Sequence, residues 1–197
     1  MSPSETGAHY NEIASWWREN TPESYGVSQL ERAIRFAAEK GVSLDVGCGS
    51  HGRFIEALTR AGFRAEGVDI APNMIALARE RSPRAVFYVA DICEWELPRK
   101  YDFISAWDST FHLPIGEQEP VLKKLCAGLA PRGVLLFTCG GGEAGEITGS
   151  FAGQDFGYST LGVEEFVRLL RAFGCRCRHV EYDQHPENHV CIIAQRI

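Results

Sequence analysis

Long apolar runs are missing from this sequence of 197 residues. None approaches the roughly 20 residues that a bilayer-spanning helix needs. The opening segment, Met1–Glu5, contains no basic stretch followed by an apolar one, so it does not have the pattern of a signal peptide. We therefore expect a cytoplasmic protein with no membrane partner.

Positive charge is also scarce, because 20 Lys and Arg residues stand against 26 Asp and Glu residues, for a formal net charge of −6. Nucleic acids and anionic membranes are bound by basic surfaces, so this balance argues against both as partners. It leaves a small molecule as the expected partner. The oligomeric state cannot be read from the sequence.

The seven cysteines form no convincing metal motif. Cys175-x-Cys177 followed by His179 has the residue types of a zinc site, but on an expected strand these alternate residues simply share one face. Other cysteines fall inside expected strands, where they serve as small buried residues. We expect no metal.

What the sequence does contain is a glycine-rich turn between an expected strand and an expected helix. The short apolar stretch Val42 to Val46 predicts a buried strand, and the pattern from Arg53 to Ala61 predicts a helix. Between them, Gly47, Gly49 and Gly52 form Gly-x-Gly-x-x-Gly. Such a turn brings the backbone close to a ligand and points the free N–H groups of the helix start toward it. Alternatively, the glycines make only a tight turn.

Acidic residues lie at the ends of three expected strands, which favours the ligand-binding interpretation. Asp45 comes two residues before the first glycine, Asp69 ends the strand from Arg64 to Val68, and Asp91 follows the strand from Ala85 to Val89. Ligands of open α/β sheets bind at the carboxyl ends of the strands, and an acid on the second strand can accept hydrogen bonds from ribose hydroxyls.

These segments resemble the class I S-adenosylmethionine-dependent methyltransferases, and the resemblance covers nearly the whole chain. The matching motifs are Leu44–Gly49, Gly67–Met74, Phe87–Ile92 and Leu129–Phe137. In one respect the sequence departs from the family, because many members read Gly-x-Gly-x-Gly and this chain has an extra residue between Gly49 and Gly52. We therefore expect a slightly longer turn, with the contacts of Ser50 and His51 left open.

Five strands that alternate with helices predict a doubly wound parallel sheet. The resemblance implies a Rossmann-like α/β fold, with a mostly parallel seven-stranded sheet, an antiparallel last strand and additional N-terminal helices. We expect a single domain over residues 1–197. Its expected parts are an N-terminal helical lid or anchor (1–40), a cofactor-binding core (41–139), a substrate-side loop (140–160) and a closing helix with an antiparallel strand pair (161–197).

Within these parts, we expect one amphipathic helix from His9 to Asn20 and a second from Gln29 to Lys40, with Ser28 as its cap. The glycine-rich stretch Gly140 to Gly157 shows almost no periodicity and is expected to be a mobile substrate loop.

The resemblance implies S-adenosylmethionine as the cofactor and S-adenosylhomocysteine as its product. We expect Asp69 to bind the ribose, Asp91 and Ile92 to contact the adenine, and Trp107 and Asp108 to contact the methionine part. The full set of expected cofactor contacts is Asp45, Gly47, Cys48, Gly49, Ser50, Gly52, Asp69, Ile70, Met74, Asp91, Ile92, Trp107 and Asp108.

Candidates for the acceptor side are mainly aromatic. They are Tyr10, Trp16, Trp17, Phe111 and Tyr158, all of which can equally be packing residues. His112 is the candidate general base, because an unperturbed histidine titrates near pH ~6.5. The alternative is a histidine that packs and makes one structural hydrogen bond.

The predicted function is methyl transfer to a small molecule, mainly by proximity and orientation, since the sulfonium donor is already activated. The phenolic, amine or carboxylic nature of the acceptor is left open. One alternative is a protein that binds the cofactor without catalysis. Another is a nicotinamide-dependent oxidoreductase. This hypothesis is the weaker one, because the sequence has no Tyr-x-x-x-Lys pair and no separate substrate domain.

Overall fold

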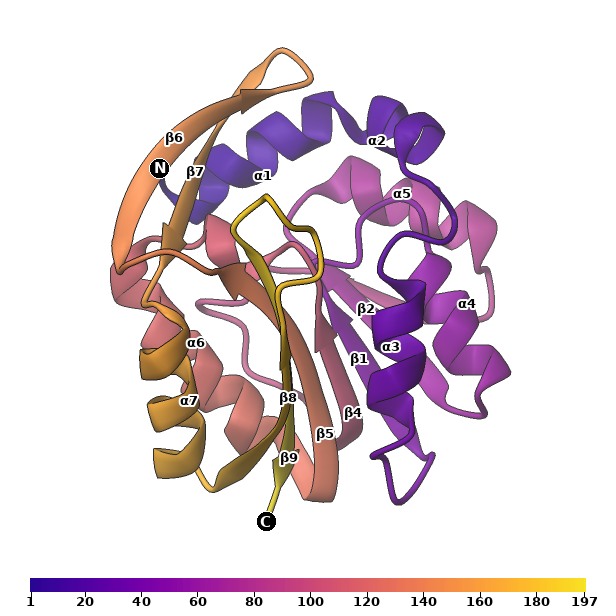
Figure 1. The fold of residues 1–197 in the computed structure, drawn as a ribbon. Helices are drawn as coiled ribbons and strands as arrows, with labels where there is room; N and C mark the ends of the chain where they lie inside the picture. Colours follow the sequence, from indigo (N-terminus) through magenta and orange to yellow (C-terminus); the bar gives the residue numbers. More distant parts are fainter.

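A mixed seven-stranded sheet runs through the computed structural model, which describes residues 1–197 (Figure 1). Its strands are β1 (Val42–Val46), β2 (Arg64–Asp69), β3 (Val86–Val89), β4 (Tyr101–Ala106), β5 (Leu129–Gly140), β8 (Cys175–Glu181) and β9 (His189–Arg196). They lie in the order β3-β2-β1-β4-β5-β9-β8. The first five pair in parallel, whereas β9 is antiparallel to both β5 and β8. This confirms the predicted Rossmann-like sheet with its antiparallel last strand.

Seven α-helices and one short 3₁₀ helix accompany the sheet. They are α1 (Pro3–Glu12), α2 (Ala14–Asn20), α3 (Val27–Ile34), α4 (Arg53–Arg60), α5 (Pro72–Arg81), η1 (Thr110–His112), α6 (Ile115–Gly128) and α7 (Val163–Ala172). None of these helices has the length and apolarity that crossing a bilayer would demand.

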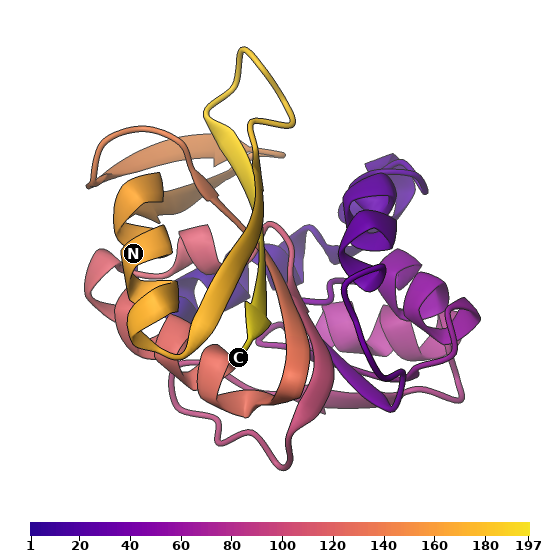
Figure 2. The ribbon, with the colours of Figure 1, turned by 60° about the horizontal axis from the view of Figure 1, so that its bottom comes forward.

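Five of the helices form one layer on each face of the sheet, with α6 and α7 on one side and α3, α4 and α5 on the other (Figure 2). Buried side chains of α6 and α7 pack into one apolar core, and those of α3, α4 and α5 pack into another. Successive residues of β5 alternate between the two, because side chains of a strand point to opposite faces. Leu135 and Phe137 belong to the first core, and Val134 and Leu136 to the second. This two-layer packing holds the carboxyl ends of the central strands in fixed positions.

The N-terminal segment differs from the single expected helix from His9 to Asn20. It forms two helices, α1 and α2, which meet at Ile13. The first begins earlier than expected because Ser2 and Glu5 form a capping box: the Ser2 Oγ accepts the Glu5 N–H at 3.3 Å, and the Glu5 carboxylate accepts the Ser2 N–H at 2.7 Å. A proline at the first helical position favours the same start.

The start of α3 also differs from the prediction. Gly26 precedes this helix with a left-handed φ of 75°, and Ser28 lies inside the helix, where its hydroxyl donates to the side chain of Gln29. The predicted Ser28 cap is therefore wrong. The helix ends at Ile34 and not at Lys40.

The largest correction concerns the expected mobile loop from Gly140 to Gly157. Most of it is an antiparallel hairpin of β6 (Gly145–Phe151) and β7 (Gln154–Thr160). Ala152 and Gly153 connect the strands, with φ values of 50° and 79°. Two adjacent positive φ angles give the two-residue turn that matches the natural twist of a hairpin.

The hairpin is anchored to the rest of the molecule at its base and along one face. The Thr160 hydroxyl donates to the Gly140 carbonyl at 2.8 Å, which ties the two ends of the insertion together. Phe156 is fully buried, with its ring centroid 4.6 Å from that of Tyr10 on α1. Figure 1 shows the hairpin and α1 side by side above the sheet. Together with α2, they form a roof over the carboxyl ends of the strands.

Candidate active site

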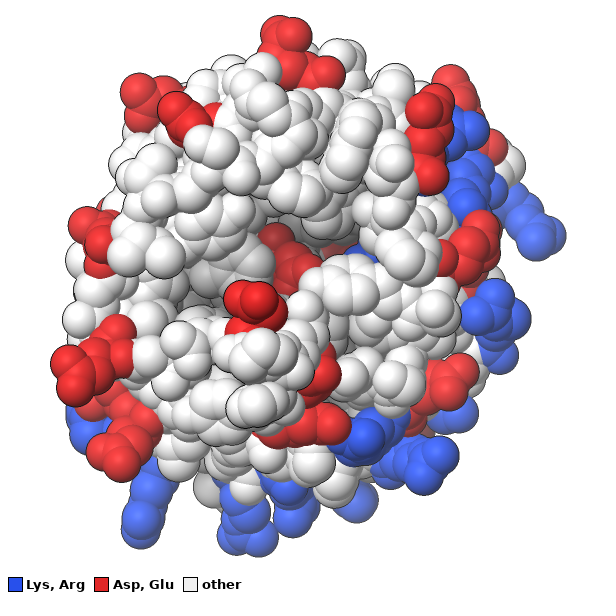
Figure 3. Space-filling view, turned by 45° about the horizontal axis from the view of Figure 1, so that its top comes forward, with Lys and Arg blue, Asp and Glu red and all other residues white.

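A cavity lies at the carboxyl ends of β1, β2 and β4, beneath the roof. Its empty volume is about 1000 Å³, including the mouth that opens to solvent. Figure 3 shows the hollow from outside, with acidic side chains in its depth and most Lys and Arg side chains away from it. Eleven of the thirteen expected cofactor contacts line this cavity: Asp45, Gly47, Cys48, Gly49, Asp69, Ile70, Met74, Asp91, Ile92, Trp107 and Asp108.

The glycine turn forms one wall of the cavity. The Gly47 and Cys48 N–H groups both donate to the Val68 carbonyl, at 2.8 and 3.1 Å, so the turn is fixed to β2. Gly47 has a φ of 68°, and a Cβ atom there would collide with the side chain of Ser109. The glycine is therefore required both by its backbone conformation and by the close approach of the next wall.

Ser50 and Gly52 are the two expected contacts that do not line the cavity. Ser50 is fully buried and donates its hydroxyl to the Ala14 carbonyl at 3.0 Å. Gly52, with a φ of 69°, immediately precedes α4. The longer turn thus directs Ser50 toward the roof, and these two residues shape the turn from outside the cavity.

Asp69 is held in place by two backbone donors. Its Oδ2 accepts the Gly49 N–H and its Oδ1 accepts the Ala71 N–H, both at 2.9 Å. Burial raises the pKa of Asp69 above its usual value, while these N–H groups oppose the shift. Each carboxylate oxygen keeps a further lone pair for a ligand hydroxyl.

Asp45 and Asp91 occupy different environments. Asp45 is buried beneath the turn, where it accepts the Ser105 hydroxyl at 2.7 Å and where burial raises its pKa to about 7. Asp91 lies at the end of β3 and accepts the Cys93 N–H at 2.9 Å through Oδ1. Asp91 is therefore a turn aspartate as well as a lining residue, and its Oδ2 makes no hydrogen bond within the protein.

Near Trp107 and Asp108, the lining of the cavity includes one half-buried cation. Arg53, the first residue of α4, lines the cavity, donates Nε–H to the Tyr25 carbonyl at 2.7 Å and makes no ion pair. Its guanidinium lies 5.3 Å from the centroids of the Tyr25 and Phe54 rings. Arg53 was not among the expected site residues, although a cation directly after a glycine turn is a usable signal.

Three buried polar atoms among the lining residues lack a hydrogen-bond partner: Thr6 Oγ1, Trp107 Nε1 and Ser109 Oγ. Buried polar atoms without partners are rare, so their presence in one cavity indicates a polar ligand. With the glycine turn and Asp69 beside them, these residues fit a nucleoside cofactor that carries an amino-acid tail. Thr6 lines the cavity together with Pro3 and Tyr10, at helical spacing along α1. Pro3 and Thr6 were not among the expected site residues, because the helix was expected to begin at His9.

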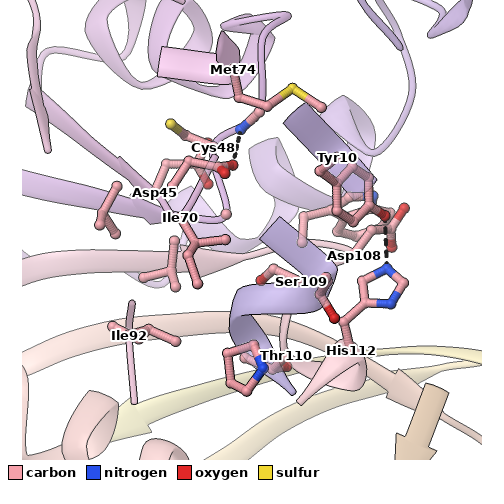
Figure 4. A pocket seen from close by; sticks show the side chains of 18 of the residues that line it. Tyr10, Asp45, Cys48, Ile70, Met74, Ile92, Asp108, Ser109, Thr110 and His112 are labelled. Carbon is pink, nitrogen blue, oxygen red and sulfur yellow. Dashed lines mark hydrogen bonds between the residues drawn. The ribbon is translucent and has the colours of Figure 1, made fainter. Parts of the chain in front are cut away.

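Tyr10 and His112 face each other across the roof side of the cavity (Figure 4). His112 Nδ1 lies 2.9 Å from the Gly157 carbonyl, which can only accept, so Nδ1 carries the proton. The Nε2 lone pair therefore accepts the Tyr10 hydroxyl, at 2.7 Å. Burial lowers the pKa of His112 to about 4, so its ring is neutral at pH 7.

The other expected acceptor-side aromatics surround this pair at different depths. Trp17 lines the cavity and packs edge-on against Tyr10, whereas Trp16 is 42% exposed and packs against Phe151 of the hairpin. Phe111 and Tyr158 do not line the cavity. Their rings pack against His112, with centroids 4.7 and 4.9 Å away, and so support it from behind.

A hydrogen-bonded network behind the cavity was not expected. Asp108, with an unusual φ of 49°, accepts the Tyr25 hydroxyl at 2.6 Å and contacts His189 Nε2 at 2.8 Å. His189 Nδ1 in turn lies 2.6 Å from Asp183. Asp108 and His189 are 81 positions apart, so no local pattern could have revealed this contact.

Residues 17–146 match the model of a family described as a methyltransferase domain. Over 112 residues, the chain is 29% identical to dTDP-3-amino-3,6-dideoxy-alpha-D-glucopyranose N,N-dimethyltransferase from Streptomyces fradiae, covering 55% of this chain and 44% of that protein. It is 30% identical over 104 residues to phosphoethanolamine N-methyltransferase from Plasmodium falciparum, covering 51% and 39%. The chain thus spans less than half the length of these two curated relatives.

Solved structures share the fold over nearly the full length. Magnesium protoporphyrin IX methyltransferase from Synechocystis, with bound S-adenosylmethionine, superposes with a TM-score of 0.77 at 17% identity, covering 100% of this chain and 98% of that one. An amino pentose methyltransferase from Micromonospora echinaspora gives 0.70 at 22% identity, covering 94% and 96%. Because the family model matches well over half of the chain, this protein belongs to the methyltransferase domain family and has the fold of the class I, S-adenosylmethionine-dependent enzymes.

Proposed function

We propose that the protein transfers a methyl group from S-adenosylmethionine to a small-molecule acceptor. The observation that carries this proposal is the cavity itself. The glycine turn, the carboxylate of Asp69 and the unpartnered polar atoms of Trp107 and Ser109 border one space at the carboxyl edge of the sheet. Open α/β sheets bind their ligands at this edge.

Each end of the cavity suits a different part of the cofactor. The free lone pairs of Asp69 are placed to accept the ribose hydroxyls. The Oδ2 of Asp91 can accept from the adenine amino group, and Ile92 offers an apolar surface to the ring. The turn residues that line the cavity would lie along the middle of the cofactor. Ser50 and Gly52 act only by shaping that turn.

The methionine part of the cofactor belongs at the end formed by Trp107, Asp108 and Arg53. Among the Lys and Arg residues only Arg53 lines the cavity, and it is partly desolvated without a carboxylate partner. A guanidinium binds a carboxylate through two parallel hydrogen bonds, so Arg53 is the proposed partner of the methionine carboxylate. The methionine carboxylate would give the partly desolvated guanidinium of Arg53 the ion-pair partner that it lacks within the protein.

The bound cofactor supplies a methyl group already activated on a sulfonium. The chain therefore has to hold the acceptor close and aligned and to exclude water, an effect worth about 7–11 kcal/mol in favourable cases. The roof, with Tyr10 and Trp17 facing inward, is suited to this task.

His112 is available as a base only to an acceptor that displaces the Tyr10 hydroxyl from Nε2. A hydroxyl or amine in that position would present its proton to the lone pair. With a pKa of about 4, His112 is a weak base, so we expect its contribution at the low end of the usual ~10²–10⁴-fold range.

A small acceptor is favoured because α1, α2 and the hairpin cover the cavity. The relatives named above methylate an amino sugar nucleotide and phosphoethanolamine, which are also small molecules.

Calorimetric titration with S-adenosylmethionine, S-adenosylhomocysteine and NADH tests the proposal. We expect micromolar binding of the first two and none of NADH, followed by product formation in a screen of small acceptors. Binding of NADH alone would overturn the cofactor assignment. Tight cofactor binding with no transfer to any acceptor would favour the non-catalytic alternative.

A further inference from the structure

His189 contacts a carboxylate with each of its two ring nitrogens. Nε2 lies 2.8 Å from Asp108 Oδ1, and Nδ1 lies 2.6 Å from Asp183 Oδ1. A carboxylate can only accept, so both contacts are hydrogen bonds only if both nitrogens carry protons. Two ionised carboxylates are therefore both satisfied only by an imidazolium, and only 13% of this side chain is exposed. The side-chain nitrogen of Gln184 also lies 3.1 Å from Nδ1, beside Asp183.

The surroundings of the ring favour that charge. The ionisable groups that face it are Asp108 at the end of β4 and Asp183 in its own β8–β9 turn. Tyr25, before α3, lies one contact further away through Asp108, and Arg53, on α4, lies one contact beyond Tyr25. Burial alone would lower the pKa of His189, but the hydrogen bonds and charges of the two carboxylates outweigh it and raise the pKa to about 9.

The imidazolium is connected to the cavity through Asp108 and Tyr25. Asp108 lines the cavity in a left-handed conformation and accepts the Tyr25 hydroxyl at 2.6 Å. Gln184, from the same turn as Asp183, donates to that hydroxyl at 2.9 Å. The Tyr25 carbonyl accepts the Arg53 Nε–H at 2.7 Å. A continuous set of hydrogen bonds thus leads from the β8–β9 turn to the only guanidinium in the cavity.

We propose that His189 is a positioning residue: as a cation clamped between Asp108 and Asp183, it holds Asp108, Tyr25 and Arg53 in the arrangement that binds the amino-acid end of the cofactor. The inference rests on the proposed function, and it adds a residue outside the cavity to the groups that determine cofactor affinity. Neutral His189 can donate from one nitrogen only, so it must lose one of its two carboxylates. Deprotonation therefore loosens the amino-acid end of the site.

The first test needs no cofactor. Nuclear magnetic resonance follows the imidazole C–H signals of the wild-type protein through a pH titration, with each signal assigned by through-bond correlation to its own backbone. We expect His189 to titrate near pH 9. A midpoint at the ordinary value near ~6.5 would overturn the proposal, even if every variant failed to fold.

The second test measures S-adenosylhomocysteine affinity by calorimetry as a function of pH. At pH 7, His189→Gln should bind about ten- to a hundredfold more weakly than the wild type, the range expected for losing a hydrogen bond to a charged group. Asp183→Asn keeps the histidine but removes one charge, so the pH at which affinity falls should move down. The amino group of the free ligand titrates identically in every experiment, so differences between the pH profiles of the variants arise in the protein or its complex.

Glu187→Gln is the matched control, because it removes an exposed carboxylate from the same turn without touching His189. It should behave as the wild type. Wild-type affinity and an unshifted pH profile in both His189→Gln and Asp183→Asn would overturn the positioning role alone. A wild-type protein that binds no S-adenosylhomocysteine at any pH would overturn the proposed function, and the role of His189 toward the cofactor with it.

Discussion

Replacing Asp69 by asparagine tests its role in cofactor binding and its role in fold stability, each by its own measurement. The carboxylate accepts the Gly49 and Ala71 N–H groups, and its remaining lone pairs are assigned to the ribose hydroxyls. Asp69→Asn preserves the size of the side chain but turns one acceptor oxygen into an amide donor. The variant therefore loses one backbone hydrogen bond and one bond to the ribose.

The expected magnitude follows from that count. A hydrogen bond to a charged group contributes about 1.5–3 kcal/mol, so losing the ribose bond should weaken S-adenosylhomocysteine binding by about 10- to 150-fold. Loss of the backbone bond should lower the free energy of unfolding by a similar amount. Calorimetry gives the first quantity, and urea unfolding without ligand gives the second.

Asp102→Ala is the control, since the Asp102 carboxylate accepts the Val42 N–H at 2.9 Å at the amino ends of β1 and β4, away from the cavity. This variant also loses one backbone hydrogen bond to a carboxylate. We expect reduced stability and unchanged cofactor affinity. If Asp69→Asn binds the cofactor within about twofold of the wild type, the assignment of Asp69 to the ribose is refuted.

Two further predictions concern the roof. Because burial lowers the pKa of His112 from 6.5 to about 4, the folded state binds fewer protons than the unfolded state between these values, and stability should fall by about 3 kcal/mol as the pH drops through this range. His112→Gln should lose less stability between pH 7 and pH 4 in urea unfolding; an unchanged acid dependence would contradict this. Phe156→Ala should cost about 3–5 kcal/mol of stability, because Phe156 is fully buried between α1 and η1. Ile147→Ala, at a side chain 72% exposed on the same hairpin, should change stability by less than about 0.5 kcal/mol, and equal losses would show that the hairpin is not packed as described.

The sequence predicted the central sheet well because its evidence is local. β1, β2 and β3 are short segments between turn residues, and each was expected within a residue of its observed bounds. The acidic residues that follow the strands were placed at the cavity for the same reason, since parallel strands share a carboxyl edge.

The roof was predicted poorly, and its physical character explains why. β6 is mostly exposed, β7 is partly buried and both contain glycine, so the hairpin shows neither an apolar run nor a clear alternation, and Phe156 is its one fully buried anchor. The early start of α1 did have a signal, the capping box of Ser2 and Glu5. The contacts of His189 with Asp108 and Asp183 had no such sequence signal, because Asp108 lies far from the other two residues in the chain.

The Thr160–Gly140 hydrogen bond, which joins the two ends of the hairpin insertion, has a consequence for the history of such a fold. Insertions whose ends lie close together can be exchanged without disturbing the scaffold that carries them. The floor of the cavity is formed by the ends of the sheet strands, whereas the hairpin contributes no strand to that sheet. A different hairpin can therefore reshape the roof while the strand order stays as it is, as long as it replaces the contacts of Phe156 with Tyr10 and of the Gly157 carbonyl with His112.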